Sequence, residues 1–162
     1  MTPSAQETTS VRVQIVVDAP IDHAFTVFTA GLGTWFPPEY NLLAVPIAER
    51  IFEPRAGGRV YDRGTDGTEC HWGNVLVYDP PTRIVISWNI SPRWQIEADP
   101  ANRSEVEVRF FPETDDRTRV ELDHRHLERH GDGWQKQREE LGGDGGWPGC
   151  LRKYAERVKV RA

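Results

Sequence analysis

Two histidines at the end of an alternating stretch are the residues of this sequence best placed for chemistry. Val120 and Leu122 alternate with charged residues, and the same period of two places His124 and His126 on the apolar row that faces inward. An imidazole changes charge near neutral pH, so it can exchange a proton or contact a ligand. Buried polar side chains are usually hydrogen-bonded parts of a core. The pattern therefore leaves a structural role and a ligand-contacting role open.

The His-x-His spacing also permits metal binding, because both rings lie on one face of a strand. A protein metal site needs at least a third ligand, and the sequence offers only the distant Glu69 and His71 for that position. We therefore predict no metal site. No other pattern in the chain predicts a cofactor.

Glu69 and His71 form a second cluster, two residues apart on one row of a predicted strand. A carboxylate beside an imidazole can serve as general acid and base. Their row also holds Val75, while the opposite row holds Trp72, so either row can face the core. A solvated strand end explains the pair equally well. The catalytic residues of any reaction stay unknown at this point.

The common motifs of catalysis are absent from the sequence. It contains neither G-x-S-x-G nor H-E-x-x-H, and the glycine-rich residues 142–146 lack the G-x-x-x-x-G-K-[ST] pattern that cradles phosphate. A hinge followed by a helix is the better interpretation of these glycines. Cys70 and Cys150 stand far apart without C-x-x-C spacing, which predicts two buried free thiols.

Composition limits the class of protein and its partners. The chain has 162 residues, with 25 acidic against 20 basic side chains and a net charge of −5. This balance argues against a nucleic-acid partner or an anionic membrane surface. No apolar run approaches the roughly 20 residues of a membrane span. Residues 1–10 have neither a basic nor an apolar signal segment, so we expect a disordered leader, one domain over 11–160 and a cytoplasmic location; homodimer formation stays open.

The hydrophobic pattern predicts an ordered series of elements. Residues 11–17 alternate as a strand, Asp18 signals a helix start, and residues 21–36 predict two short helices. Residues 91–103 contain two prolines and Trp94 and predict a covering loop. Six further strands, separated by turn signals such as Asp66-Gly67, are predicted over 47–53, 59–63, 68–78, 84–90, 105–110 and 118–126.

A helix ends the chain. Trp147, Leu151, Tyr154 and Val158 follow one another at steps of four, three and four, which places them on one stripe, while charged residues occupy the other side. A helix of about 13 residues is marginal alone in water. We therefore expect this stripe to pack across the sheet.

This order of elements resembles the helix-grip fold of the START-related, polyketide-cyclase and birch-pollen-allergen (Bet v 1-like) superfamily, abbreviated SRPBCC. The resemblance implies an α+β protein in which a curved antiparallel β-sheet, two short helices and a long C-terminal helix enclose a cavity. Within the superfamily the chain is similar to the branch named after the activator of heat-shock-protein-90 ATPase. The similar stretches are Phe52–Arg59, Trp72–Val75, Asp79–Pro81, Ile86–Trp88, Thr118–Arg125 and Gly145–Trp147 with Leu151.

What this resemblance implies about function is a ligand cavity. Members of the superfamily typically hold an apolar ligand between the sheet and the terminal helix; some are cyclases, aromatases or lipid carriers, and the namesake of the branch regulates a chaperone. A shared fold does not transfer an activity. No catalytic residue of the family maps onto this chain.

We predict that the protein binds a small, largely apolar or aromatic ligand in this cavity. The alternatives are an enzyme of cyclase or hydrolase type that uses cavity His and Glu residues, or a protein-interaction module. If the histidines touch a neutral ligand, affinity should fall between about pH 7 and 5. The predicted ligand-binding residues come from both layers, the covering loop and the two polar clusters: Trp35, Glu69, His71, Val75, Trp88, Trp94, Phe110, His124, His126 and Trp147.

Overall fold

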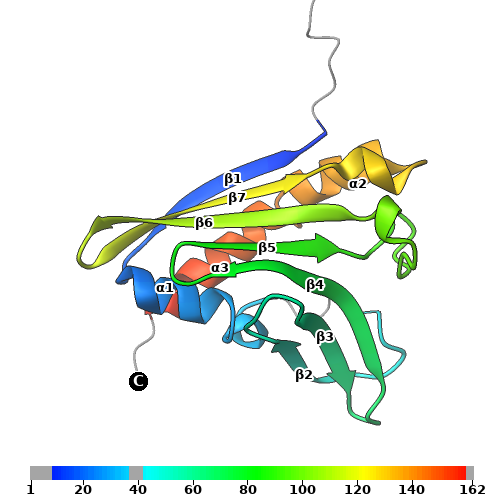
Figure 1. Ribbon diagram of the computed structural model, residues 1–162, viewed down its shortest axis with the longest axis horizontal. Coiled ribbons are helices and arrows are strands. Elements are labelled where there is room, and N and C mark those ends of the chain that lie inside the picture. Colours follow the sequence, from blue (N-terminus) through cyan, green and yellow to red (C-terminus); the bar gives the residue numbers. More distant parts are fainter. Residues whose placement is uncertain (1–8, 37–41, 160–162) are drawn as a thin grey trace, which may run out of the picture.

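The computed structural model of the protein describes residues 9–36 and 42–159. One antiparallel sheet of seven strands runs in the order β1-β7-β6-β5-β4-β3-β2 (Figure 1). Its strands are β1 (Val11–Val17), β2 (Ile47–Phe52), β3 (Arg59–Gly64), β4 (Glu69–Asp79), β5 (Arg83–Trp88), β6 (Ser104–Thr114) and β7 (Arg117–Arg125). The helical segments are α1 (Ile21–Phe28), η2 (Leu32–Thr34), η3 (Pro100–Asn102), η4 (Leu127–His130), α2 (Trp134–Gly142) and α3 (Trp147–Lys159).

These elements confirm the predicted α+β class and the helix-grip order. The strands differ from the predicted ranges mainly at their ends. β5 stops at Trp88, because Ile90 pairs only with Ile96 in an isolated bridge of the following loop. Asp18 does not cap α1: the N-cap is Pro20, and the Asp18 carboxylate pairs instead with Arg117, with 3.2 Å between Nη2 and Oδ1. Residues 1–8 of the predicted leader lie outside the described residues.

Strand β4 joins the two halves of the sheet and bends between them (Figure 1). Its register shifts between Val75 and Val77 opposite β5, and the β3 register shifts between Val60 and Tyr61 opposite β4. Such irregularities break the strict alternation of side chains between the two faces of a strand. As a result Trp72 and Val75, which alternation would place on opposite faces, are both buried.

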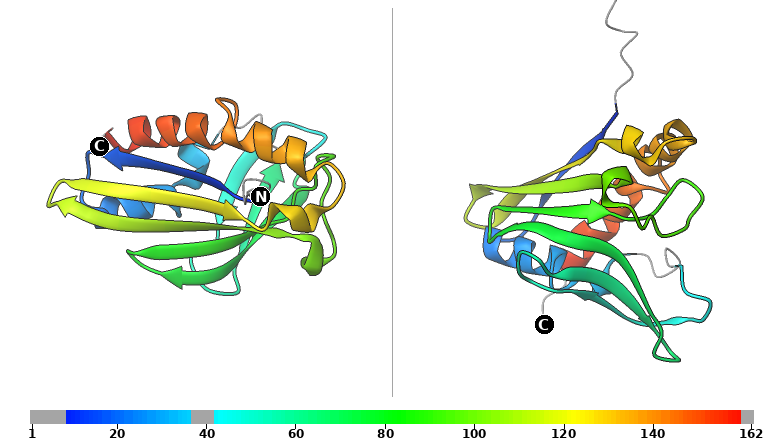
Figure 2. Two further views of the ribbon diagram at one scale, coloured as in Figure 1. Left: turned by 90° about the horizontal axis from the view of Figure 1, so that it is seen from above. Right: turned by 45° about the vertical axis from the view of Figure 1, so that its right-hand side comes forward.

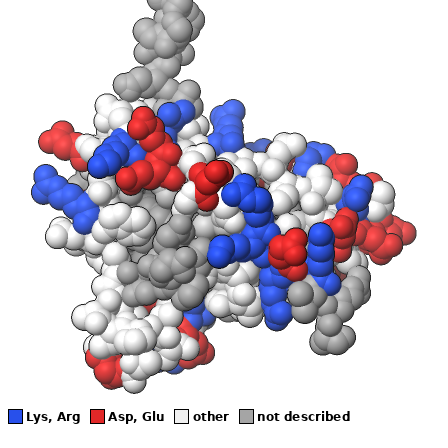
Figure 3. Space-filling model, turned by 180° about the vertical axis from the view of Figure 1, so that it is seen from behind, with Lys and Arg blue, Asp and Glu red and all other residues white. Residues whose placement is uncertain are grey.

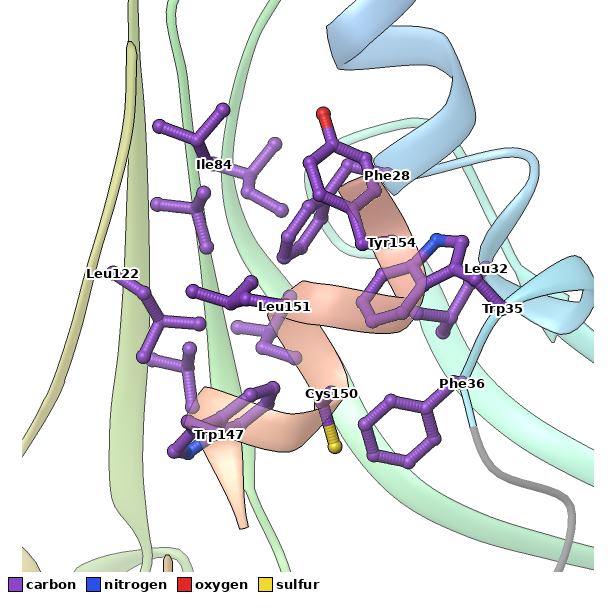
Figure 4. Close-up of a cluster of buried hydrophobic side chains, with 14 of the residues drawn as sticks. Phe28, Leu32, Trp35, Phe36, Ile84, Leu122, Trp147, Cys150, Leu151 and Tyr154 are labelled. Carbon is purple, nitrogen blue, oxygen red and sulfur yellow. The ribbon is translucent and has the colours of Figure 1, made fainter. Parts of the chain in front are cut away.

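Helix α3 lies across the concave face of the sheet (Figure 2, left). The predicted stripe of Trp147, Leu151, Tyr154 and Val158 is buried, which confirms the packing expected from the spacing. Figure 4 shows Trp147, Leu151 and Tyr154 turned toward the sheet and α1. The Tyr154 hydroxyl donates to the carbonyl of Ala24 at 2.6 Å and so ties α3 to α1. Burial raises the pKa of this phenol.

The surface carries both signs of charge. Acidic and basic side chains are interspersed over the face in Figure 3, which is seen from the side opposite to Figure 1. On the outer face of the sheet, Glu107 pairs with Arg83, Arg109 and Arg125 at 2.5, 3.2 and 2.8 Å. Among the described residues no helix is long and apolar enough to span a membrane.

The packing of α3 gives a test of the fold. Leu151 is 1% exposed, so Leu151→Ala should lower the free energy of unfolding by about 2–5 kcal/mol, because it leaves a cavity between helix and sheet. Lys153 lies on the exposed face of the same helix, and Lys153→Ala should change it by no more than about 0.5 kcal/mol. Urea unfolding of both variants measures the difference. Equal losses would contradict this packing.

Candidate functional site

An apolar cleft opens where β4, β5, the loop after β5, α2 and the start of α3 meet. Its volume is about 70 Å³, well below the roughly 300–1,000 Å³ of sites that hold drug-sized ligands. A bound molecule of that size therefore requires the cleft to widen. The lining residues are Phe36, Trp72, Trp88, Ile90, Ser91, Pro92, Trp94, Gln137, Glu140, Leu141, Gly145, Gly146, Trp147 and Cys150.

Four rings form a continuous aromatic wall along the cleft. Phe36 and Trp72 are stacked, with centroids 5.6 Å apart and an interplanar angle of 13°. Trp88 meets Trp72 edge to face at 5.6 Å, and Trp147 meets Trp88 in the same way at 5.6 Å. Both arrangements suit the charge distribution of aromatic rings. Phe36, Trp147 and Cys150 lie together at the lower end of the cluster in Figure 4.

A buried ion pair holds one half of this wall. The Arg50 guanidinium meets the Asp62 carboxylate through two parallel contacts of 2.7 and 3.1 Å, and both side chains are almost fully buried. Asp62 also accepts the indole N–H of Trp72 at 3.1 Å. Arg50 donates to the backbone carbonyl of Phe36 at 3.0 Å, and its guanidinium carbon lies 4.8 Å from the Phe36 ring centroid. One ion pair thus fixes both stacked rings.

The Arg50–Asp62 pair was not predicted from the sequence, although a signal was present. Arg50 shares the inward row of β2 with Phe52, and Asp62 shares the inward row of β3 with Val60. In the antiparallel register Arg50 lies directly opposite Asp62. Opposite charges at inward positions of a predicted hairpin could therefore have indicated a buried pair.

A chain of hydrogen bonds holds the other half of the wall. The indole N–H of Trp147 lies 3.0 Å from His124 Nδ1, and His124 Nε2 lies 2.7 Å from Ser104 Oγ. Ser104 Oγ lies 2.7 Å from His130 Nε2. Because an indole can only donate, His124 Nδ1 must accept, so a neutral His124 carries its proton on Nε2 and donates it to Ser104. His124 thereby fixes the orientation of Trp147.

The pKa values of the two histidines in this row of hydrogen bonds agree with a neutral His124. Burial lowers its pKa from 6.5 to about 3, with a smaller contribution from His130. Burial also lowers the pKa of His130. His124 therefore stays uncharged between pH 7 and 5, and its own charge gives no reason for ligand affinity to change in that window.

The structure confirms the inward position of His124 but not that of His126. Strand β7 ends at Arg125, and His126 adopts a left-handed backbone conformation with φ of 63°. The pleat therefore ends before His126, and its side chain leaves the inward row. The second buried histidine is His130 of η4, which hydrogen-bonds Ser104. Only the fold brings it next to His124.

The other predicted site residues are divided between the cleft, the core and the surface. Trp88, Trp94 and Trp147 line the cleft. Trp35 lines a second, fully apolar cavity of about 20 Å³ beneath it, so the space between sheet and α3 is nearly filled by side chains. Val75 and Phe110 are buried in the core and line neither space.

Glu69 and His71 lie at the start of β4, away from the cleft. His71 Nε2 is 3.0 Å from Glu69 Oε1, and more than a third of the Glu69 side chain is exposed. The hydrogen bond from His71 lowers the pKa of Glu69. This is the solvated strand end that the sequence offered as an alternative. The ionisable residues that do line the cleft are the exposed Glu140 and the buried thiol of Cys150.

Residues 9–36 and 42–159 contain no group of three or more His, Cys, Asp or Glu side chains arranged to hold a metal ion. Neither Cys70 nor Cys150 forms a disulfide among the described residues, and the predicted burial is confirmed for Cys150 but not for Cys70, which is partly exposed. Burial raises the pKa of the Cys70 thiol.

A polar hollow of about 380 Å³ also lies on the outer face of the sheet, between β1, β6 and β7. Its charged side chains largely pair with one another: Glu107 contacts Arg109 at 3.2 Å, and Arg12 contacts Asp123 at 3.6 Å. An apolar cleft with a few polar groups is the usual form of a small-molecule site. The aromatic cleft is therefore the better candidate despite its smaller volume.

Comparison with known proteins finds a family model that matches most of the chain. Residues 18–159 match the model of the family described as activator of Hsp90 ATPase homolog 1-like protein. The structure resembles that of Txn09, an anthrahydroquino-gamma-pyrone synthase complexed with SUM, with 41% identity, a TM-score of 0.65, and coverage of 93% of this chain and 97% of that chain. A search of curated proteins finds no match.

Two further solved structures share the fold. CalC from Micromonospora echinospora, described as a self-sacrificing resistance protein, is 29% identical with a TM-score of 0.65, and the match covers 92% of this chain and 93% of CalC. Protein NE0264 from Nitrosomonas europaea is 16% identical with a TM-score of 0.65 over 93% of this chain and 94% of that chain. At that identity the likeness shows the fold alone.

The Arg50–Asp62 pair gives a stability prediction. Arg50→Met leaves the Asp62 carboxylate buried without its cation, so the free energy of unfolding should fall by about 3–5 kcal/mol. Arg63 on the neighbouring strand pairs with Glu49 and Glu69 near the surface, and Arg63→Met should cost at most about 1 kcal/mol. Urea unfolding at pH 7 compares the two. A small loss for Arg50→Met would show that the pair is dispensable.

The neutral His124 gives a pH prediction. Its pKa is lower in the folded protein than in the unfolded chain, so its contribution to stability is complete above about pH 6.5 and decreases as pH falls toward 3. At about 1.36 kcal/mol per pH unit, the titration of His124 should lower the free energy of unfolding by about 2 kcal/mol between pH 6.5 and 5.

His124→Gln should reduce this slope and leave the part due to His130, whose pKa burial also lowers, whereas His71→Gln, at the exposed start of β4, should leave the slope unchanged. Chemical unfolding at several pH values measures the slope independently of any loss in absolute stability. A slope that His124→Gln does not alter would mean that His124 titrates normally in the folded protein.

Proposed function

The chain belongs to the activator of Hsp90 ATPase homolog 1-like protein family, and from this membership and the geometry of the cleft we propose that it binds a planar aromatic small molecule against the wall of Phe36, Trp72, Trp88 and Trp147. The observation that carries the proposal is that polar groups fix this wall from behind. Asp62 holds Trp72, and His124 holds Trp147. Rings held in place lose little conformational entropy when they stack on a ligand.

The mouth of the cleft supports the same proposal. Trp94 lines the cleft from the loop after β5 and is 49% exposed, which is unusual for so large an apolar side chain. Its backbone has a φ of 58°, a left-handed conformation that bulky residues rarely adopt. Strained backbone of this kind often occurs at ligand-binding segments. We propose that Trp94 covers the open face of the bound ring system when the cleft widens.

The class of ligand follows from the likeness to Txn09. That protein is described as an anthrahydroquino-gamma-pyrone synthase, a name that denotes a fused, oxygen-bearing ring system. An identity of 41% over nearly the whole of both chains supports a ligand of related chemistry here. Flat fused rings also suit a cleft whose lining is mostly aromatic. The proposed ligand is therefore a polycyclic aromatic molecule that carries oxygen substituents.

A ring-closing enzyme is the second candidate function. It is favoured by the description of Txn09 as a synthase and by the position of Glu140, the one carboxylate among the described lining residues. A carboxylate at the mouth of an apolar cleft can remove a proton from a phenol or an enol of a bound ligand. Chemical change of a bound fused-ring ligand, lost in Glu140→Gln, would favour the enzyme over a protein that only binds.

Ligand titration tests the binding proposal. Addition of fused aromatic compounds should quench or shift the tryptophan fluorescence, because three tryptophans of the cleft wall contact the ligand. Trp94→Ala should weaken binding by about 3- to 10-fold, which corresponds to the roughly 0.5–1.5 kcal/mol of an aromatic pair.

The matched control is Ile96→Ala. Ile96 is exposed in the same loop but does not line the cleft, so its removal should leave affinity unchanged. If no compound of the panel binds wild-type protein more tightly than about millimolar, the aromatic wall is better explained as part of the core.

A further inference from the structure

One tryptophan of the wall differs from its neighbours in hydrogen bonding. The other three buried tryptophans, Trp35, Trp72 and Trp147, each donate the indole N–H to an acceptor 2.9 to 3.1 Å away. The indole N–H of Trp88 is buried and has no partner among the described residues. Buried donors are nearly always paired in folded proteins. The unpaired indole N–H of Trp88 therefore belongs to a residue of the cleft wall.

Gln137 carries a buried acceptor atom that has no partner among the described residues. It is the one buried residue of α2, a helix whose other side chains are polar or partly exposed. Its amide Nε2 donates to the carbonyl of Ile90 at 3.0 Å, and this bond fixes which end of the amide is oxygen. The remaining atom, Oε1, is a buried acceptor that has no partner in the described part of the chain.

Both side chains line the same cleft, so an unpaired donor and an unpaired acceptor occur in one apolar site. His130 and Asp123 also carry a buried atom without a hydrogen-bond partner, but neither residue lines the cleft. An apolar ligand would leave the two cleft atoms unsatisfied, whereas a ligand with matching polar atoms removes the cost of burying them. A few such groups in an apolar site are what selects one ligand over another.

We propose that Trp88 and Gln137 determine which ligands the cleft accepts. The Trp88 N–H donates a hydrogen bond to a carbonyl oxygen of the ligand, and Gln137 Oε1 accepts one from a ligand hydroxyl. The preferred class is a fused aromatic ring system that carries both groups, such as a hydroxylated gamma-pyrone or quinone. This inference rests on the proposed binding function, and it adds the two residues that read the oxygen substituents.

Three probes of similar size separate these contributions: naphthalene, chromone, which adds a ring oxygen and a carbonyl, and 7-hydroxychromone, which adds a hydroxyl to chromone. Isothermal titration calorimetry of the wild-type protein at pH 7 should show affinity rising about 5- to 10-fold at each step. A ligand that lacks the matching polar group leaves the buried donor or acceptor of the protein unpaired, and its affinity is therefore lower.

Substitutions assign each step to one residue. Trp88→Phe should abolish the preference for chromone over naphthalene, because the ring stays but the donor is lost. Gln137→Leu should keep that preference and abolish the gain from the hydroxyl group. Trp147→Phe is the matched control: its N–H is already bonded to His124, so the affinities for all three probes should change by the same factor.

A spectroscopic measurement makes the test independent of how well the variants fold. In the wild-type protein, the indole N–H resonance of Trp88 should move downfield with chromone and not with naphthalene. Failure of all three probes to bind would overturn the binding function and this inference together. Probes that bind with equal affinity, or ratios unchanged in Trp88→Phe and Gln137→Leu, would overturn the inference and leave the binding function standing.

Discussion

The aromatic cleft depends on one buried ion pair, between Arg50 of β2 and Asp62 of β3. Two charges are costly to bury, and this pair is tolerated because each partner also forms a hydrogen bond with the wall. Asp62 accepts from Trp72, and Arg50 donates to the Phe36 carbonyl while lying over the Phe36 ring. The pair therefore does more than join two strands. It sets the positions of two stacked rings that come from distant parts of the chain.

The opposite side of the wall follows the same principle with neutral groups. His124 is kept uncharged by burial, accepts the indole N–H of Trp147 and is itself held by Ser104. The start of α3 is fixed as well, because an added Cβ at Gly149 would lie 2.1 Å from the carbonyl oxygen of Asp144. The residues between α2 and α3 thus pack closely on the first turn of α3. Hydrogen bonds thus hold the wall at both ends, whereas Trp94, at the mouth of the cleft, is exposed.

The packing beneath α3 explains why the open space is small. The space under α3 is filled by Trp35, Phe110 and their neighbours, so the core supplies stability rather than a deep chamber. The open space lies at one end of the sheet, where β4 bends and the loop after β5 covers it. In such a site recognition depends on few contacts. The unpaired Trp88 N–H and Gln137 oxygen are then the groups that give it chemical selectivity.

The sequence by itself determined the seven strands, the first and last helices, their order and the buried stripe of α3, because alternation and helical spacing are local properties of the chain. It also placed His124 in the interior and Trp88, Trp94 and Trp147 near one another. It could not place Trp72, since the register shifts of β4 break alternation, or His126, since the strand ends one residue earlier. The links from Asp62 to Trp72, Ser104 to His130, and Gln137 to Ile90 were decided only by the tertiary structure. Each joins different elements of the fold, and a hydrogen bond of this kind depends on how those elements pack rather than on any spacing along the sequence.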